Sequence, residues 1–185
     1  MLALIFIIVG AMGLNIRSLL KEQRFKAETS LVVDTLRLAQ DLMLIAESDA
    51  HVRFAPDKES GGILYWIELE KPLTKSWIRE LVRKRAPLTA IRWVEFEEAQ
   101  GGRVANQFDL HFLSGGSVMS QGNLRLANAD RQPSMQGYIC LPGYPVPLVL
   151  SNAPCEIKKQ TELEKLTFYT QREIFEREQK NALKQ

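Results

Sequence analysis

Hydrophobic and polar positions divide the first 46 residues into two halves of one continuous segment. Residues 1–16 (MLALIFIIVGAMGLNI) carry no charge, and Asn15 is the only strongly polar side chain among them. From Arg17 to Ala46 there is neither proline nor glycine, and apolar residues recur with the period of a helix. One predicted face holds Leu31, Thr35, Leu38, Leu42 and Ile45, and the face beside it holds Val32, Leu36, Ala39, Met43 and Ala46. The pattern predicts one long helix with an apolar first half and an amphipathic second half.

The apolar half is short for a membrane span. As a helix, residues 1–16 would measure about 24 Å, whereas a hydrocarbon core of about 30 Å needs about 20 residues. A cleaved secretory signal is the alternative, because its apolar region is short. Such a signal has basic residues before that region and a small-residue cleavage site after it. The sequence given starts directly on apolar residues, and residues 15–18 (NIRS) make a poor cleavage site, so an uncleaved anchor is favoured.

The helix is predicted to end near residues 48–50, where the period changes to two and predicts strands. The predicted strands cover residues 51–54, 63–69, 91–97, 108–112, 118–126 and 137–141, with residues 148–150 as a further candidate. Glycine pairs at residues 61–62, 101–102 and 115–116 indicate turns. A short helix over residues 77–85, capped by Ser76, interrupts the strands. Residues 142–147 (PGYPVP) are predicted at a sheet edge, because proline cannot donate to a central ladder.

These elements predict an α+β fold. A long N-terminal helix, membrane-embedded in its first half, packs on an antiparallel β-sheet or sandwich-like globular domain, and a C-terminal helix follows. The predicted segments are 1–50, with residues 1–16 as the anchor, a β-rich globular domain over 51–150, and a C-terminal helical extension over 151–185. Residues 156–185 contain no proline or glycine; a solvated tail that is helical only in part fits them equally well.

Composition and charge indicate one modest globular core. The chain has 185 residues, of which 45% are hydrophobic and 25% charged, enough for one core after the anchor. The net charge of +2 does not by itself indicate nucleic acid. Arg17, Lys21, Arg24 and Lys26 outnumber Glu22 just after the apolar half. The positive-inside rule would leave these basic residues in the cytoplasm. That placement would conflict with a function in which the rest of the chain is exported across the membrane.

A second basic cluster lies within the predicted short helix. It consists of Arg79, Arg83, Lys84 and Arg85. These residues could face anionic lipid or nucleic acid, but that helix face has no aromatic residue that would stack on bases. A solvated helix face is therefore favoured, and no nucleic-acid partner is expected.

The sequence contains little that indicates catalysis. It lacks the motifs of serine hydrolases, zinc proteases, P-loop enzymes and dinucleotide-binding folds. His51 and His111 are its only histidines, and Asp109 with His111 on one strand face is interpreted as a surface pair rather than a catalytic dyad. No catalytic residue, metal ligand or cofactor is predicted. Cys140 and Cys155, 15 positions apart, could form a disulfide worth about 3 kcal/mol in an oxidising compartment, or remain one buried and one surface thiol.

The N-terminal residues resemble those of type IV pilins and type II secretion pseudopilins. Residues 1–13 are similar to the run that follows F-T-L-I-E at the start of the mature family chain, so Met1 would be about the sixth mature residue. Five more residues would lengthen the apolar helix to about 31 Å, enough to span. The processing site and the assembly glutamate of the family are not in this sequence. We therefore expect an in-frame upstream stretch that encodes them.

The likeness extends over roughly residues 1–150. Residues 112–118 (FLSGGSV), 124–126 (LRL) and 138–143 (YICLPG) are similar to the strand and glycine rhythm of H-type minor pseudopilins, although Gly143 comes two positions early. No calcium-site loop of the major pseudopilins is evident. The resemblance implies that the first helix serves membrane insertion and subunit assembly through Leu2, Leu4, Ile5, Phe6, Ile8, Val9, Gly10 and Gly13.

The sequence thus favours a structural protein over an enzyme. The leading hypothesis is a minor pseudopilin whose anchor holds it in the inner membrane, with its globular domain in the periplasm, before it joins a filament. Its expected partners are other pseudopilin or minor pilin subunits, inner membrane lipid and assembly platform proteins. The alternative is a single-pass anchored adaptor or binding domain that does not polymerise. An anchored enzyme is disfavoured.

Overall fold

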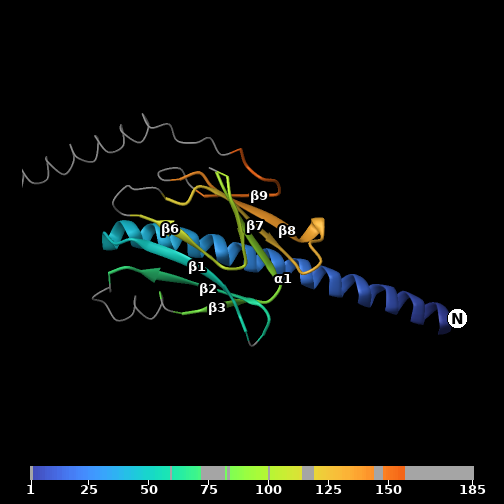
Figure 1. The fold of residues 1–185 in the computed structure, drawn as a ribbon. Coiled ribbons are helices and arrows are strands. Elements are labelled where there is room, and N and C mark those ends of the chain that lie inside the picture. The colour runs from blue at the N-terminus through green and yellow to red at the C-terminus, as the bar shows by residue number, and fades with distance from the viewer. Residues whose placement is uncertain are drawn as a thin grey trace, which may run out of the picture.

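The computed structural model describes residues 2–58, 60–71, 82, 84–99, 101–113, 119–143 and 148–156, with side chains from residue 17 onward. One long helix leads into two antiparallel sheets (Figure 1). This confirms the predicted α+β class with an N-terminal helix packed on antiparallel strands. The predicted short helix lies outside the described residues apart from its last part, and the predicted C-terminal helix lies outside them from residue 157.

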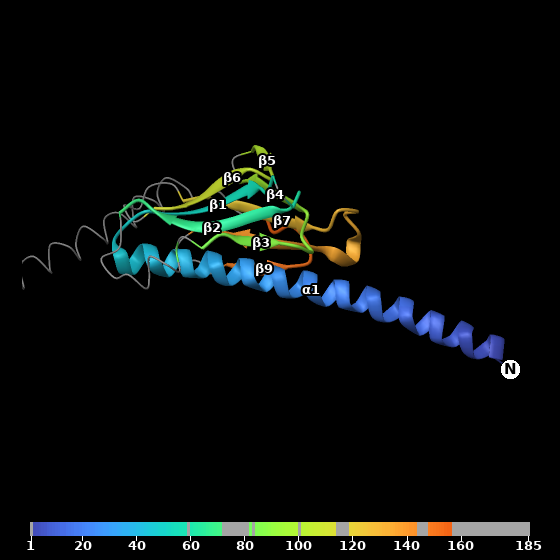
Figure 2. The same cartoon turned by 90° about the horizontal axis from the view of Figure 1, so that it is seen from below.

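Helix α1 runs from Leu2 to Ala46, 45 residues without a proline, and is about 68 Å long. Its C-terminal half lies along the sheets, whereas its N-terminal half projects beyond them (Figure 2). The sequence predicts that residues 1–16 are the membrane-embedded part. Within the described residues, however, no helix combines the length and the apolarity that crossing a membrane requires.

The first sheet has four strands in the order β3-β2-β1-β6. They are β1 (Ala50–Pro56), β2 (Ile63–Leu69), β3 (Ala86–Leu88) and β6 (Phe108–Phe112). Strand β3 was not predicted, because Pro87 was interpreted as the end of a helix. It is an edge strand, which is where a sheet tolerates proline.

The second sheet has five strands in the order β5-β4-β7-β8-β9. They are β4 (Trp93–Glu98), β5 (Arg103–Ala105), β7 (Gly122–Ala127), β8 (Gln136–Leu141) and β9 (Val149–Ser151), with a 3-10 turn, η1 (Pro133–Met135), before β8. The predicted strand over residues 118–126 therefore starts later, at Gly122. Strand β5, three exposed residues long, was not predicted.

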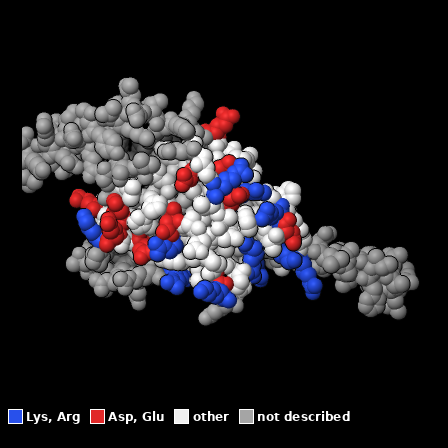
Figure 3. Space-filling view, viewed as in Figure 1, with Lys and Arg blue, Asp and Glu red and all other residues white. Residues whose placement is uncertain are grey.

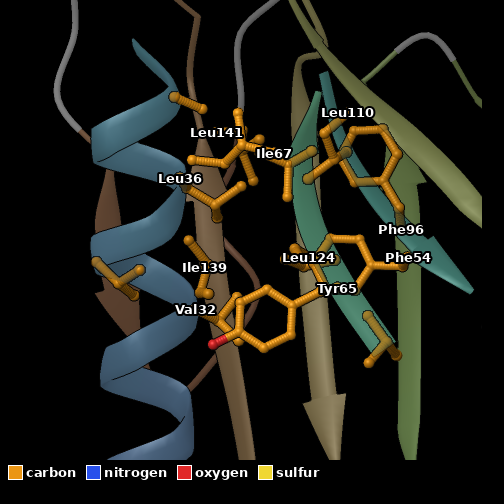
Figure 4. Packing of buried hydrophobic residues seen from close by; sticks show 14 of the residues in the cluster. Val32, Leu36, Phe54, Tyr65, Ile67, Phe96, Leu110, Leu124, Ile139 and Leu141 are labelled. Carbon is orange, nitrogen blue, oxygen red and sulfur yellow. The ribbon is translucent and has the colours of Figure 1, made fainter. Parts of the chain in front are cut away.

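A single apolar core lies where α1 and the inner faces of both sheets meet. Figure 4 shows Val32 and Leu36 pointing from α1 into the space that the sheet side chains fill. Phe96 of the second sheet stacks on Phe108 of the first, with ring centroids 6.1 Å apart, and Phe108 also stacks on Phe54. Burial of a side chain such as Leu36 contributes about 1.5–3 kcal/mol. The core therefore holds the second half of α1 firmly against both sheets.

Candidate functional site

One side of α1 remains uncovered and carries an apolar stripe. Leu31, Leu38 and Ile45 follow one another at intervals of seven residues, nearly two helical turns, and therefore lie in line. Leu31 is 56% exposed and Ile45 is 78% exposed, whereas Leu38 is partly buried. Leu20, 49% exposed, lies three turns before Leu31 on the same side of the helix, with the exposed Arg24 between them. We call these four residues the apolar stripe.

The two predicted faces of the helix have different surroundings in the structure. The face with Val32, Leu36, Ala39 and Met43 is fully buried. In the other face only Leu42 is fully buried, and Leu31 and Ile45 are exposed to solvent. Exposed apolar side chains in line on a helix could meet an apolar partner, although Leu19 and Leu44, 58% and 51% exposed, lie on other sides of the same helix.

The residues predicted for membrane insertion and assembly lie on the projecting half of α1 (Figure 2). Leu2, Leu4, Ile5, Phe6, Ile8, Val9, Gly10 and Gly13 are all helical, and their side chains lie outside the described part of the chain. The apolar stripe begins at Leu20, shortly after this segment. The structure therefore brings the predicted anchor and the exposed stripe together on one continuous rod.

The two histidines meet on the outer face of the first sheet. His51 on β1 is the direct cross-strand partner of His111 on β6, and their Nδ1 atoms are 2.9 Å apart. The rings meet edge to face, with centroids 4.8 Å apart. The sequence suggested Asp109 and His111 as a surface pair; the structure instead pairs His111 with His51. The strand register, which the sequence alone does not give, makes this contact.

An arginine joins the carboxylates beside the histidines. Arg53 donates to both oxygens of Asp109, at 2.8 and 2.9 Å, and forms an ion pair with Glu68 at 3.0 Å. The hydrogen bond from Arg53 is the main cause that lowers the pKa of Asp109. Asp109 therefore stays ionised and held by Arg53, which leaves it poorly placed to orient His111 as a catalytic base would require.

A cavity of about 590 Å³ lies between α1 and the β9 edge of the second sheet. Phe25 and Thr29 line it from α1, and Gly137 and Leu150 line it from β8 and β9. Its described lining includes no histidine or cysteine. The cavity could receive a side chain or a small molecule. The cavity could not be predicted from the sequence, because α1 and β9 are distant in the chain.

The cysteines are joined as a disulfide. Cys140 on β8 is bonded to Cys155, and their Cα atoms are 5.9 Å apart. Asn123 on β7 fixes the same place from the neighbouring strand, since its amide accepts from the backbone N–H of Cys155 at 2.9 Å and donates to its carbonyl at 3.0 Å. The two links hold the segment after β9 against the outer face of the second sheet.

Neither a metal-binding cluster nor a similar protein indicates a function for the described part of the chain. Among the described residues no group of three or more histidine, cysteine, aspartate or glutamate side chains is arranged to hold a metal ion. No protein-family model, curated protein or solved structure shows significant similarity to this chain.

Proposed function

We propose that the chain is a structural subunit, a minor pseudopilin of a type II secretion pseudopilus or of a related type IV pilus-like filament. The observation that carries the proposal is the form of α1. Its second half is packed into the globular core, and its first half projects from it (Figure 2). A projecting helix can enter a bundle with the corresponding helices of other subunits while the sheets stay outside.

The apolar stripe supports the same role. Leu31 and Ile45 have no cover within the described part of the chain, and they lie in line with the projecting half. Contact with neighbouring helices would stabilise the assembly by about 25 cal/mol for each Å² of apolar surface that it removes from water. The seven-residue interval is the one by which packed helices keep a common seam.

Before assembly, the projecting half is the part that would associate with the inner membrane, with the sheets in the periplasm. Apolar side chains that lipid satisfies can equally be satisfied by neighbouring helices. The Cys140–Cys155 bond fits an oxidising compartment such as the periplasm.

No enzymatic activity, cofactor or nucleic-acid partner is part of the proposal. Within the described part of the chain, the outer faces carry ion pairs such as Arg103 with Glu97 and Arg125 with Glu95. On the face shown in Figure 3, positive and negative side chains are interspersed over the globular part, without the broad basic surface typical of nucleic-acid binding.

Self-association of the full chain tests the proposal. We expect the double variant L31D/I45D to shift the chain from oligomers to monomer in analytical ultracentrifugation. The control is V104D, which adds a charge at an exposed apolar residue away from α1, on β5 and 43% exposed, and should leave the oligomers intact. A monomeric parent chain, or equal behaviour of both variants, would support an anchored adaptor that does not polymerise and would overturn the filament role.

A further inference from the structure

The outer face of the first sheet gathers the only two histidines of the chain into one contact. His111 is exposed and His51 is half-buried, so solvent and ions reach the pair. The Nδ1···Nδ1 distance of 2.9 Å means that one ring holds its proton at Nδ1 and donates to the lone pair of the other. Two imidazole nitrogens are thus fixed at the separation of a hydrogen bond.

The same separation suits a metal chelate. With metal–nitrogen bonds of about 2.0–2.1 Å, two nitrogens 2.9 Å apart subtend about 90° at the metal. Such an angle belongs to the square-planar or tetragonal coordination that Cu²⁺ and Ni²⁺ adopt with nitrogen and oxygen ligands. Tetrahedral Zn²⁺ needs the nitrogens about 3.3 Å apart, so its binding would require the rings to separate.

The charges beside the pair favour a cation. Arg53 contributes one positive charge, and Asp109 and Glu68 contribute one negative charge each, so the three side chains sum to −1 while both rings are neutral. Glu68 is also the direct cross-strand partner of His51, on the side away from His111. Arg53 forms ion pairs with both carboxylates. They therefore contribute negative electrostatic potential at the histidine pair and do not act as ligands of the ion.

We propose that His51 and His111 form a two-nitrogen chelating site for a divalent transition-metal ion, Cu²⁺ or Ni²⁺ in preference to Zn²⁺. In the metal-free protein the two Nδ1 positions face each other, so both rings turn until their Nδ1 lone pairs converge on the ion, and water completes its coordination. The proton now held between the two Nδ1 atoms moves through solvent to Nε2 of the same ring, so both rings remain neutral. The site lies on the outer face of the β1–β6 pair and is independent of the apolar stripe on α1.

Titration of the full chain with Cu²⁺ and with Ni²⁺ at neutral pH tests the site. We expect one ion per chain by calorimetry, and for Cu²⁺ an electron paramagnetic resonance spectrum with hyperfine splitting from two nitrogens. Because a chelate gains from two linked ligands, H51N and H111N should each weaken binding roughly tenfold or more. The control Q23N, an exposed change on α1, should bind as the parent does.

Four results would contradict the proposal. The parent chain could bind no ion beyond the level of the double variant H51N/H111N. Each single variant could keep one of two equal weak sites, which means that the histidines act independently. Binding could also persist in the double variant, which places the ligands elsewhere. Unchanged thermal unfolding of the variants without metal verifies that lost binding does not come from lost folding, and Zn²⁺ binding tighter than Cu²⁺ would contradict the geometry.

Discussion

The carboxylate of Glu28, on α1, accepts a hydrogen bond from the backbone N–H of Ile91 at 3.0 Å, across 63 positions of sequence. The same carboxylate accepts from the backbone N–H groups of Thr89 and Ala90. One acidic side chain thereby satisfies three consecutive donors of the turn between β3 and β4. This contact ties the helix to the point where the chain passes from the first sheet to the second.

Replacement of Glu28 should therefore destabilise the globular part. In E28A the N–H of Ile91, a fully buried residue, loses its acceptor, and we expect a loss of about 1–3 kcal/mol in the free energy of unfolding. Denaturant unfolding measures it. The control is E22A, which removes the i,i+4 ion pair between a half-buried glutamate and the exposed Lys26 and should cost about 0.5 kcal/mol or less. Equal losses in the two variants would show that the hydrogen bonds of Glu28 contribute nothing to the free energy of unfolding.

The two faces of α1 should respond in opposite ways to truncation. Leu36 is fully buried, so L36A should cost about 2–5 kcal/mol through lost burial and the cavity left behind. Ile45 is 78% exposed, so I45A should change the unfolding free energy by about 0.5 kcal/mol or less. Unfolding of both variants under conditions that keep the chain monomeric makes the comparison. A large loss in I45A would mean that the apolar stripe is covered within the subunit, contrary to the assembly role.

Ionisation of the Tyr65 phenol should lower the free energy of unfolding at alkaline pH. Burial raises the pKa of its phenol above the ordinary value, against a hydrogen bond with Thr35 that lowers it. Since the folded chain holds this proton more tightly than the unfolded chain, unfolding releases it between about pH 10 and the higher folded pKa. The contribution is fully present below about pH 10 and is lost above it. Unfolding free energies of the parent and of Y65F between pH 8 and 11 should diverge only at the alkaline end; parallel curves would contradict the assignment.

The disulfide should matter for stability. Reduction of Cys140–Cys155 opens a loop with a sequence separation of 15 residues, for which we expect a loss of about 3 kcal/mol. Unfolding with and without reductant measures the loss. The double variant C140S/C155S should already be less stable and should not respond to reductant. A parent chain equally insensitive to reductant would mean that the bond does not form in solution.

The sequence predicted the elements whose periodicity is long and regular. The helix up to Ala46 and the strands around Tyr65, Leu110 and Ile139 follow from apolar spacing alone, because one face of each is buried. Short elements escaped this reasoning. Strand β5 has three exposed residues, and β3 contains Pro87, so neither shows an alternating pattern.

The contacts of the candidate sites depend on register, and a single sequence does not carry register. His51 and His111 were both noted, but only the pairing of β1 with β6 places them opposite each other. Glu28 was not singled out either, since a glutamate on a polar helix face looks like any solvated charge. A carboxylate that serves three backbone donors could be recognised only once the turn at residues 89–91 was in place.

Cross-linking through the projecting half of α1 tests the central claim most directly. The described cysteines are both in the disulfide, so one added cysteine reports its own contacts. In cells that assemble the proposed filament, I8C should form disulfide-linked dimers of the full chain in high yield, because the proposed assembly packs the projecting half of one subunit against the helix of the next. V104C, on the exposed β5, should not. Equal yields for I8C and V104C would contradict a helix that joins one subunit to another.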